Sequence, residues 1–141
     1  PLRVGAEPAV GLDPCSREGR LGILGDVLFD ERHSVLFSTH STTDLGRIAD
    51  SVTRLNGGRL LCTGPTDLIR DSYVLVRGDA SDLPDAGIVR LLGPRRTSVG
   101  VEALVTADDA LLLDEHVVRE RPGIDDILIH LCSHTPSGGR P

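Results

Sequence analysis

The sequence predicts an α/β fold in its first half, followed by a smaller α+β part, and three patterns support this prediction. Leucines recur at helical spacing within residues 21–28, as in an amphipathic helix. Residues 34–38 form a short and nearly all-apolar run, which is typical of a strand buried on both faces of a parallel sheet. Residues 124–131 again carry apolar side chains at helical spacing and predict a terminal helix.

The first helix has a clear predicted start. Residues 1–13 indicate an irregular segment or a weak strand, because glycines and prolines interrupt them. Asp13 can cap the free amides of a helix, and Pro14 suits the first helical position. The apolar stripe then predicts a helix that ends near Asp30.

A second helix is predicted after strand 34–38, reaching about Ala49. Ser41 and Asp44 have the spacing of a capping box at its start, with Asp in place of Glu. An Asn-Gly-Gly sequence then predicts a hairpin turn between two short strands. The elements predicted here are strands 52–55 and 59–62, followed by a short helix over 66–70.

The pattern of predicted helices and strands changes near Ser72. The elements predicted after it are strands 73–76, 97–105 and 117–118, short helices 86–92 and 107–113, and the terminal helix. We therefore predict a domain over residues 1–71, an appendage over 72–132, and a disordered tail over 133–141, which is rich in Ser, Gly and Pro.

Composition excludes several function classes. The 141 residues carry a net charge of −6, which argues against a nucleic-acid partner. The longest apolar runs are far shorter than a membrane span, so no membrane insertion is expected. The chain has no Lys, which excludes a G-x-x-x-x-G-K-[ST] phosphate loop. Cys15, Cys62 and Cys132 form no C-x-x-C pair and indicate a reducing, cytosolic setting.

Two short segments carry the chemistry. Residues 7–14 read EPAVGLDP, and residues 35–40 read VLFSTH. In order and spacing they resemble the second half of an ATP-binding cassette (ABC) transporter ATPase. That family has a strand ending in Glu before Pro, then a G-L-D-P turn called the D-loop, and after a helix and a strand an S-T-H with the switch histidine. The resemblance covers residues 7–70 and implies the C-terminal part of a P-loop NTPase-like parallel-sheet core.

The resemblance also implies a role for each matching residue. Glu7 would polarise the attacking water, and His40 would contact the γ-phosphate of ATP bound with Mg²⁺. Asp13 and Gly11, in the D-loop, and Ser38, before the switch histidine, would lie at the nucleotide and dimer interface. No separate protein-held metal site is implied.

The family also implies partners and a place in the cell. These are a membrane permease subunit and a second ATP-binding subunit in a head-to-tail dimer, at the cytoplasmic, inner face of the membrane. Residues 72–131 resemble, more weakly, the α+β appendage of bacterial ABC ATPases of the antibiotic-resistance and lantibiotic-exporter type. The predicted function is therefore that of a fragment of an ATPase subunit that powers export.

This sequence departs from the family pattern in two respects. Ala6 stands where the family has the Asp that helps to hold Mg²⁺, and the chain has neither the phosphate loop nor the L-S-G-G-Q signature. We therefore expect a truncated product or a degenerate relative whose isolated chain is marginally stable and does not hydrolyse ATP.

Other hypotheses remain open. One is a non-enzymatic interaction module derived from an ABC ATPase, and another is a small hydrolase using Ser38, His40 and Glu7. His130 and His134 have the i, i+4 spacing of zinc ligands. A second acidic pair, at residues 114–115, is followed by His rather than Pro and does not match the family pattern.

Overall fold

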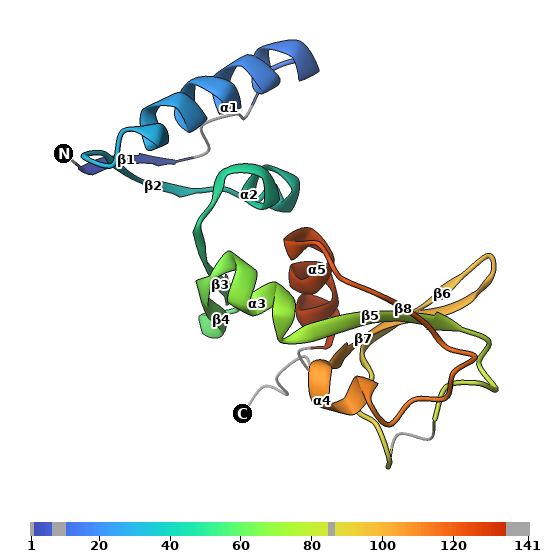
Figure 1. Ribbon diagram of the computed structural model, residues 1–141. Helices are drawn as coiled ribbons and strands as arrows, with labels where there is room; N and C mark the ends of the chain where they lie inside the picture. Colours follow the sequence, from blue (N-terminus) through green and yellow to red (C-terminus); the bar gives the residue numbers. More distant parts are fainter. Residues whose placement is uncertain (1, 7–10, 85–86, 135–141) are drawn as a thin grey trace. The chain divides into compact units, whose positions relative to one another are not determined.

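The computed structural model describes residues 2–6, 11–84 and 87–134. The chain divides into two compact units, Pro1–Ile48 and Ala49–Pro141. Figure 1 shows the order of helices and strands along both units. Residue 71, the predicted end of the first domain, lies within the second unit.

The first unit contains a parallel pair of strands joined through a helix. Its elements are β1 (Leu2–Ala6), α1 (Pro14–Phe29), β2 (Ser34–Ser38) and α2 (Thr42–Ile48). The strands pair in register, with Leu2 opposite Ser34 and Ala6 opposite Ser38. Parallel neighbours need a crossover connection, and α1 supplies it, lying alongside the strand pair in Figure 1.

The start of the chain was predicted as an irregular segment or a weak strand, and residues 2–6 form the strand, since all five residues of β1 pair with β2. The second strand differs from its prediction. β2 is not buried on both faces: Val35 and Phe37 are half-buried, and Leu36 is 60% exposed. Among the described residues its only hydrogen-bonded neighbour is β1, so no strand pairs with its other edge. A P-loop NTPase-like core remains a prediction.

The first unit has a small apolar core. Leu21 of α1 is its one buried apolar side chain among the described residues, with 4% of its surface exposed. A bidentate ion pair between Glu18 and Arg47 joins α1 to α2, with Arg47 Nη2 donating to Glu18 Oε2 at 2.9 Å. Exposed ion pairs contribute little to stability. This pair therefore adds little to the stability that the packing around Leu21 gives the first unit.

The second unit is built on an antiparallel sheet and a separate hairpin. Its elements are β3 (Ser51–Asn56), β4 (Arg59–Pro65), α3 (Thr66–Asp71), β5 (Tyr73–Gly78), β6 (Leu92–Thr97), β7 (Gly100–Thr106), α4 (Ala107–Ala110), β8 (Val118–Glu120) and α5 (Ile124–His134). β3 and β4 pair antiparallel, and four strands form a sheet in the order β6-β7-β5-β8. All pairs in this sheet are antiparallel.

The β3–β4 turn confirms the predicted hairpin. Gly57 and Gly58 both have positive φ, 55° and 74°. Two-residue hairpin turns of this kind need left-handed backbone at both positions, which glycine adopts without steric cost.

The core of the second unit lies on both faces of the four-stranded sheet. On one face α5 packs with Ile124, Ile127 and Leu128 fully buried. The other face carries a cluster of buried apolar side chains: Val76, Val89, Ala103, Val105, Ala110, Leu113 and Val117. Alternate residues of β7 therefore reach opposite layers of the core.

Three predicted elements of the second unit differ in type or in bounds from those in the structure. Residues 87–91 are not helical, and Leu92 begins β6. The predicted strand 97–105 is instead part of the β6–β7 hairpin, since the chain turns back after Thr97. α5 confirms the predicted terminal helix and continues to His134, three residues beyond its predicted end at residue 131. Residues 135–141 lie outside the described residues.

Candidate functional site

The parallel register brings two predicted site segments to one edge of the first unit. Ala6, the last residue of β1, is the partner of Ser38, the last residue of β2. Ligands of α/β proteins bind beyond the carboxyl ends of parallel strands. His40 follows Ser38 by two residues at this edge and is exposed. Glu7 follows Ala6 in the sequence but lies outside the described residues.

Asp13 caps the first helix, as predicted. Its Oδ1 accepts hydrogen bonds from the backbone amides of Cys15 and Ser16, each at 3.1 Å. The Ser16 hydroxyl donates to Asp13 Oδ2 at 2.6 Å. The bonds from Ser16 lower the pKa of Asp13, so an exposed carboxylate is held at the start of α1.

Gly11 shapes the turn that leads to Asp13. Its φ is +76°, in the left-handed region that favours glycine. No other atom would crowd a side chain here, so the requirement for glycine comes from the backbone alone. The G-L-D-P turn therefore depends on its first residue for geometry and on its third for the helix cap.

The segment after β2 is also ordered by a local hydrogen bond. The backbone amide of Ser41 donates to Thr39 Oγ1 at 3.0 Å, which turns the chain towards α2. His40 lies inside this turn, and Ser38 is exposed on the preceding strand. The structure thus describes Gly11, Asp13, Ser38 and His40 within one unit. Their nucleotide roles, and the alternative hydrolase role of Ser38 with His40, stay predictions.

The two histidines considered as zinc ligands have other partners. His130 is fully buried, with Nδ1 2.7 Å from the Gly93 carbonyl oxygen and Nε2 3.3 Å from Glu102 Oε1. His134 Nε2 lies 2.9 Å from Arg90 Nη2. Within residues 2–6, 11–84 and 87–134, no group of three His, Cys, Asp or Glu side chains could hold a metal ion.

A comparison with curated proteins finds a partial match. Over 67 residues, or 48% of this chain, the sequence is 36% identical to ATP-binding cassette sub-family A member 13 from Homo sapiens. The similarity supports an ABC ATPase. The matched stretch is 1% of the length of that protein, and no family model matches the chain. Similarity to the bacterial exporter type remains a prediction.

Transmembrane helices are not found in the described part of the chain. None of its helices is both long and apolar enough to cross a bilayer.

One group of residues in the second unit was not predicted from the sequence. Arginines from α3 and from the segment around β8 meet apolar residues of β5 and α4 around a cavity of about 520 Å³. No spacing pattern could have predicted this group, because it is made of three stretches far apart in the sequence, residues 70–74, 107–111 and 119–121.

Proposed function

We propose that this chain is part of the ATP-binding subunit of an ABC transporter and supplies its D-loop and switch histidine. Three observations support the proposal. They are the order of the two family-like sequence segments within residues 7–40, the 36% identity over 67 residues to an ABC transporter protein, and the parallel strand pair. The pairing of Ala6 with Ser38 is the observation that carries it. Because of this pairing, the carboxyl ends of both strands lie at the same edge, which is where α/β proteins bind ligands such as nucleotides.

In this proposal each residue acts on ATP–Mg²⁺. Glu7 polarises the attacking water, and His40 contacts the γ-phosphate, where charge develops during hydrolysis. Gly11 and Asp13 link this site to the second nucleotide site across a head-to-tail dimer, and Ser38 lies beside it.

The phosphate-binding parts of the site are not among these 141 residues. This chain has neither a phosphate loop nor the signature sequence, and Ala6 provides no carboxylate for Mg²⁺. We therefore propose that the chain alone does not hydrolyse ATP. In the complete assembly it would dock on a membrane permease at the inner face of the membrane and power export.

The test is reconstitution of the nucleotide site. The chain is titrated with ATP and Mg²⁺ by calorimetry, alone and mixed with the upstream half of a related ABC ATPase. We expect binding and phosphate release only in the mixture. Glu7→Gln and His40→Ala should each reduce turnover by about 100-fold or more, the scale of a lost general base or charge-stabilising group.

Matched controls come from the acidic pair that does not fit the family pattern and from the histidine that follows it. Glu115 and His116 are exposed residues of the second unit, and Glu115→Gln and His116→Ala should leave turnover unchanged. Folded chain that binds no nucleotide in the mixture would contradict the proposal and favour the non-enzymatic interaction module.

A further inference from the structure

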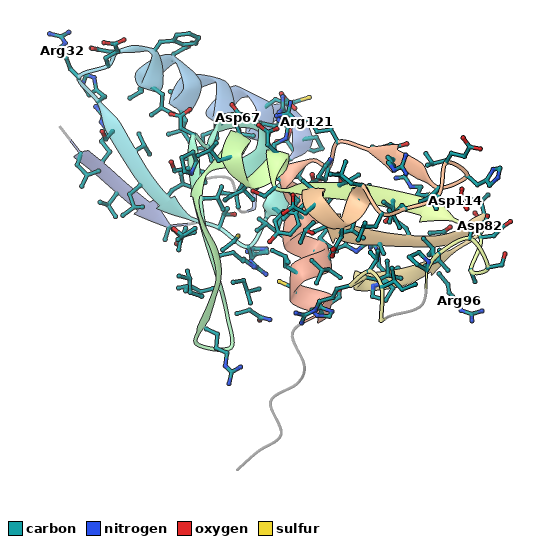
Figure 2. The ribbon with its side chains drawn as sticks, turned by 60° about the horizontal axis from the view of Figure 1, so that its bottom comes forward. Arg32, Asp67, Asp82, Arg96, Asp114 and Arg121 are labelled. Carbon is teal, nitrogen blue, oxygen red and sulfur yellow. The ribbon has the colours of Figure 1, made fainter. Side chains whose placement is uncertain are left out.

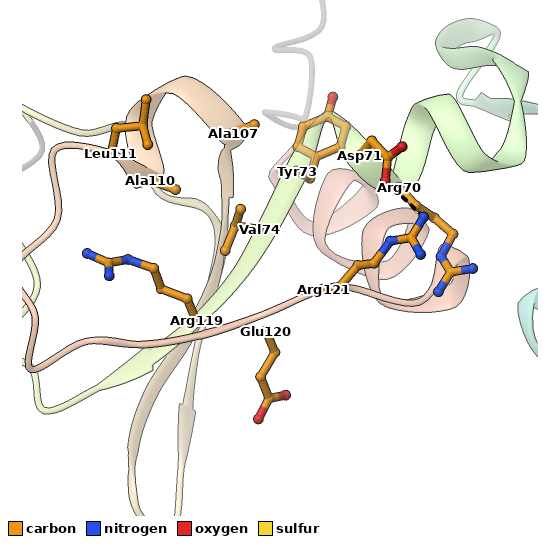
Figure 3. Close-up of a pocket in the computed structure, with 10 residues that line it drawn as sticks. All are labelled: Arg70, Asp71, Tyr73, Val74, Ala107, Ala110, Leu111, Arg119, Glu120 and Arg121. Carbon is orange, nitrogen blue, oxygen red and sulfur yellow. Dashed lines mark hydrogen bonds and ion pairs between the residues drawn. The ribbon is translucent and has the colours of Figure 1, made fainter.

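A cavity of about 520 Å³ opens in the second unit, between the start of β5, the α4 region and β8 (Figure 3). This volume is in the range of pockets that hold small organic molecules. The lining residues all belong to one compact unit. Their arrangement therefore does not depend on the nucleotide site proposed above.

One side of the cavity is apolar. It is formed by Val74 of β5, Ala107 and Ala110 of α4, and Leu111. Ala110 belongs to the buried core, and Val74 packs against it, so this wall is firmly supported. Leu111 is 83% exposed at the cavity, although burying a leucine side chain is favourable by itself. An apolar ligand would cover it.

The opposite side is cationic. Arg119 and Arg121 lie two residues apart, so both extend from the same face of the chain, while Glu120 points the other way in Figure 3. Arg70 of α3 is close to Arg121 at one end of the cavity, and Arg119 lies at the other end, beside Ala110.

The acidic residues of the lining are already neutralised. Asp71 accepts a hydrogen bond from Arg121 Nη2 at 2.8 Å. Glu120 accepts one from Arg77 Nη1 at 2.6 Å. Because both carboxylates are already paired, they do not compete with a ligand for the other arginines of the lining.

Arg119 has no such partner. Its Nη2 donates to the carbonyl oxygens of Leu113 at 2.6 Å and Asp114 at 3.2 Å. These bonds fix the guanidinium in place but leave its charge uncompensated, and no ion pair joins it to a carboxylate anywhere in the described residues. A guanidinium has five N–H donors in a planar fork, so several remain for a ligand.

We propose that this cavity binds a small organic carboxylate with an apolar body. The body packs on Val74, Ala107 and Leu111, and the carboxylate accepts charge-assisted hydrogen bonds from Arg119. Tyr73 also belongs to the lining of the cavity.

The test uses octanoate as the probe and octan-1-ol as its uncharged counterpart. Two-dimensional ¹H–¹⁵N NMR of the full chain is recorded during titration with each compound. Octanoate should shift the amide signals of residues 73–74, 107–111 and 119–121, with one-to-one stoichiometry. It should bind about tenfold or more tightly than octan-1-ol, the change that one charge-assisted hydrogen bond provides.

Two variants address the two parts of the site. Arg119→Gln should weaken octanoate binding about tenfold and leave octan-1-ol binding unchanged. Ala107→Leu should weaken both, because the larger side chain occupies the cavity. Arg96→Gln is the matched control: Arg96 is exposed on β6, away from the cavity, and Figure 2 shows it projecting outwards.

The proposal fails if octanoate binds no better than octan-1-ol or if its shifts map to other residues, such as the exposed Leu2 and Val4 of β1. It also fails if Arg119→Gln and Arg96→Gln have the same effect. Should a variant fail to fold, the shift map and the comparison of octanoate with octan-1-ol in the unmodified chain still decide the outcome.

Discussion

His130 of α5 and Glu102 of β7 are hydrogen-bonded inside the second unit, with Nε2 and Oε1 3.3 Å apart. Glu102 also accepts hydrogen bonds from Arg77 Nε at 2.8 Å and from Arg95 Nη2 at 2.7 Å. Its side chain is only 10% exposed. A single buried carboxylate therefore joins three strands of the sheet, β5, β6 and β7, to the helix α5 that packs on it.

This network predicts acid sensitivity of the second unit. Burial alone would raise the pKa of Glu102, but the bonds from Arg95 and Arg77 outweigh it and lower the pKa to about 2. The stabilisation is fully present above the ordinary pKa of 4.5 and is lost as the pH falls towards 2. It corresponds to about 3 kcal/mol of unfolding free energy. Urea unfolding of the second unit between pH 7 and pH 2.5 measures it.

Glu102→Gln removes this titration and should flatten the pH dependence below pH 4.5, while lowering stability at pH 7. Glu115→Gln, on an exposed carboxylate, is the control and should leave both unchanged. An identical pH profile for wild type and Glu102→Gln would show that the network does not contribute.

Gly93 of β6 lies directly against the backbone of α5. Its φ is +52°, and a Cβ atom would lie 2.3 Å from the His130 carbonyl oxygen. Gly93→Ala should therefore destabilise the second unit by about 2 kcal/mol or more, from backbone strain and the clash together. Gly87→Ala, where no atom lies near and φ is not positive, should change stability little. Equal effects of the two substitutions in thermal unfolding would contradict this explanation.

The cap at Asp13 predicts local order at the start of α1. Asp13→Ala leaves the amides of Cys15 and Ser16 without their acceptor, and these amides should exchange with solvent roughly fivefold faster. Asp13→Asn retains a capping oxygen and should restore most of the protection. Residue-resolved hydrogen exchange provides the measurement, and unchanged rates in Asp13→Ala would mean that the cap is dispensable.

The uneven distribution of the core predicts two unfolding transitions. Leu21 is the one buried apolar side chain described in the first unit, whereas the sheet of the second unit is packed on both faces. Stability follows buried apolar surface. The amides of α1 and β2 should therefore lose protection at lower urea concentration than those of β5, β7 and α5. Simultaneous loss of protection in both units would contradict this prediction.

Much of the local structure could be predicted from the sequence. The start of α1 at Asp13 and Pro14, the Gly57–Gly58 turn and the helical spacing over residues 124–131 were all confirmed. Each depends on residues close together in the chain, whose conformational preferences act before any tertiary contact forms. The segments that resemble an ABC ATPase are of the same local kind.

The β6–β7 hairpin could not be predicted in this way. No strand was predicted directly before residue 97, but in the structure Arg95 lies in β6 and pairs with Glu102 across the strands. The length of β6 and the place of its turn depend on pairing with β7 and on packing against α5. Such long-range contacts override weak local preferences.

The sequence by itself determined where chemistry-bearing residues such as Asp13 and His40 stand in relation to helix and strand ends, because capping and periodicity are local. Only the tertiary structure decided which strand ends meet, how Glu102 and His130 are buried together, and that Arg119 faces an apolar wall. Those relationships depend on strand register and on packing between distant segments, where burial and charge pairing over the whole unit decide the outcome.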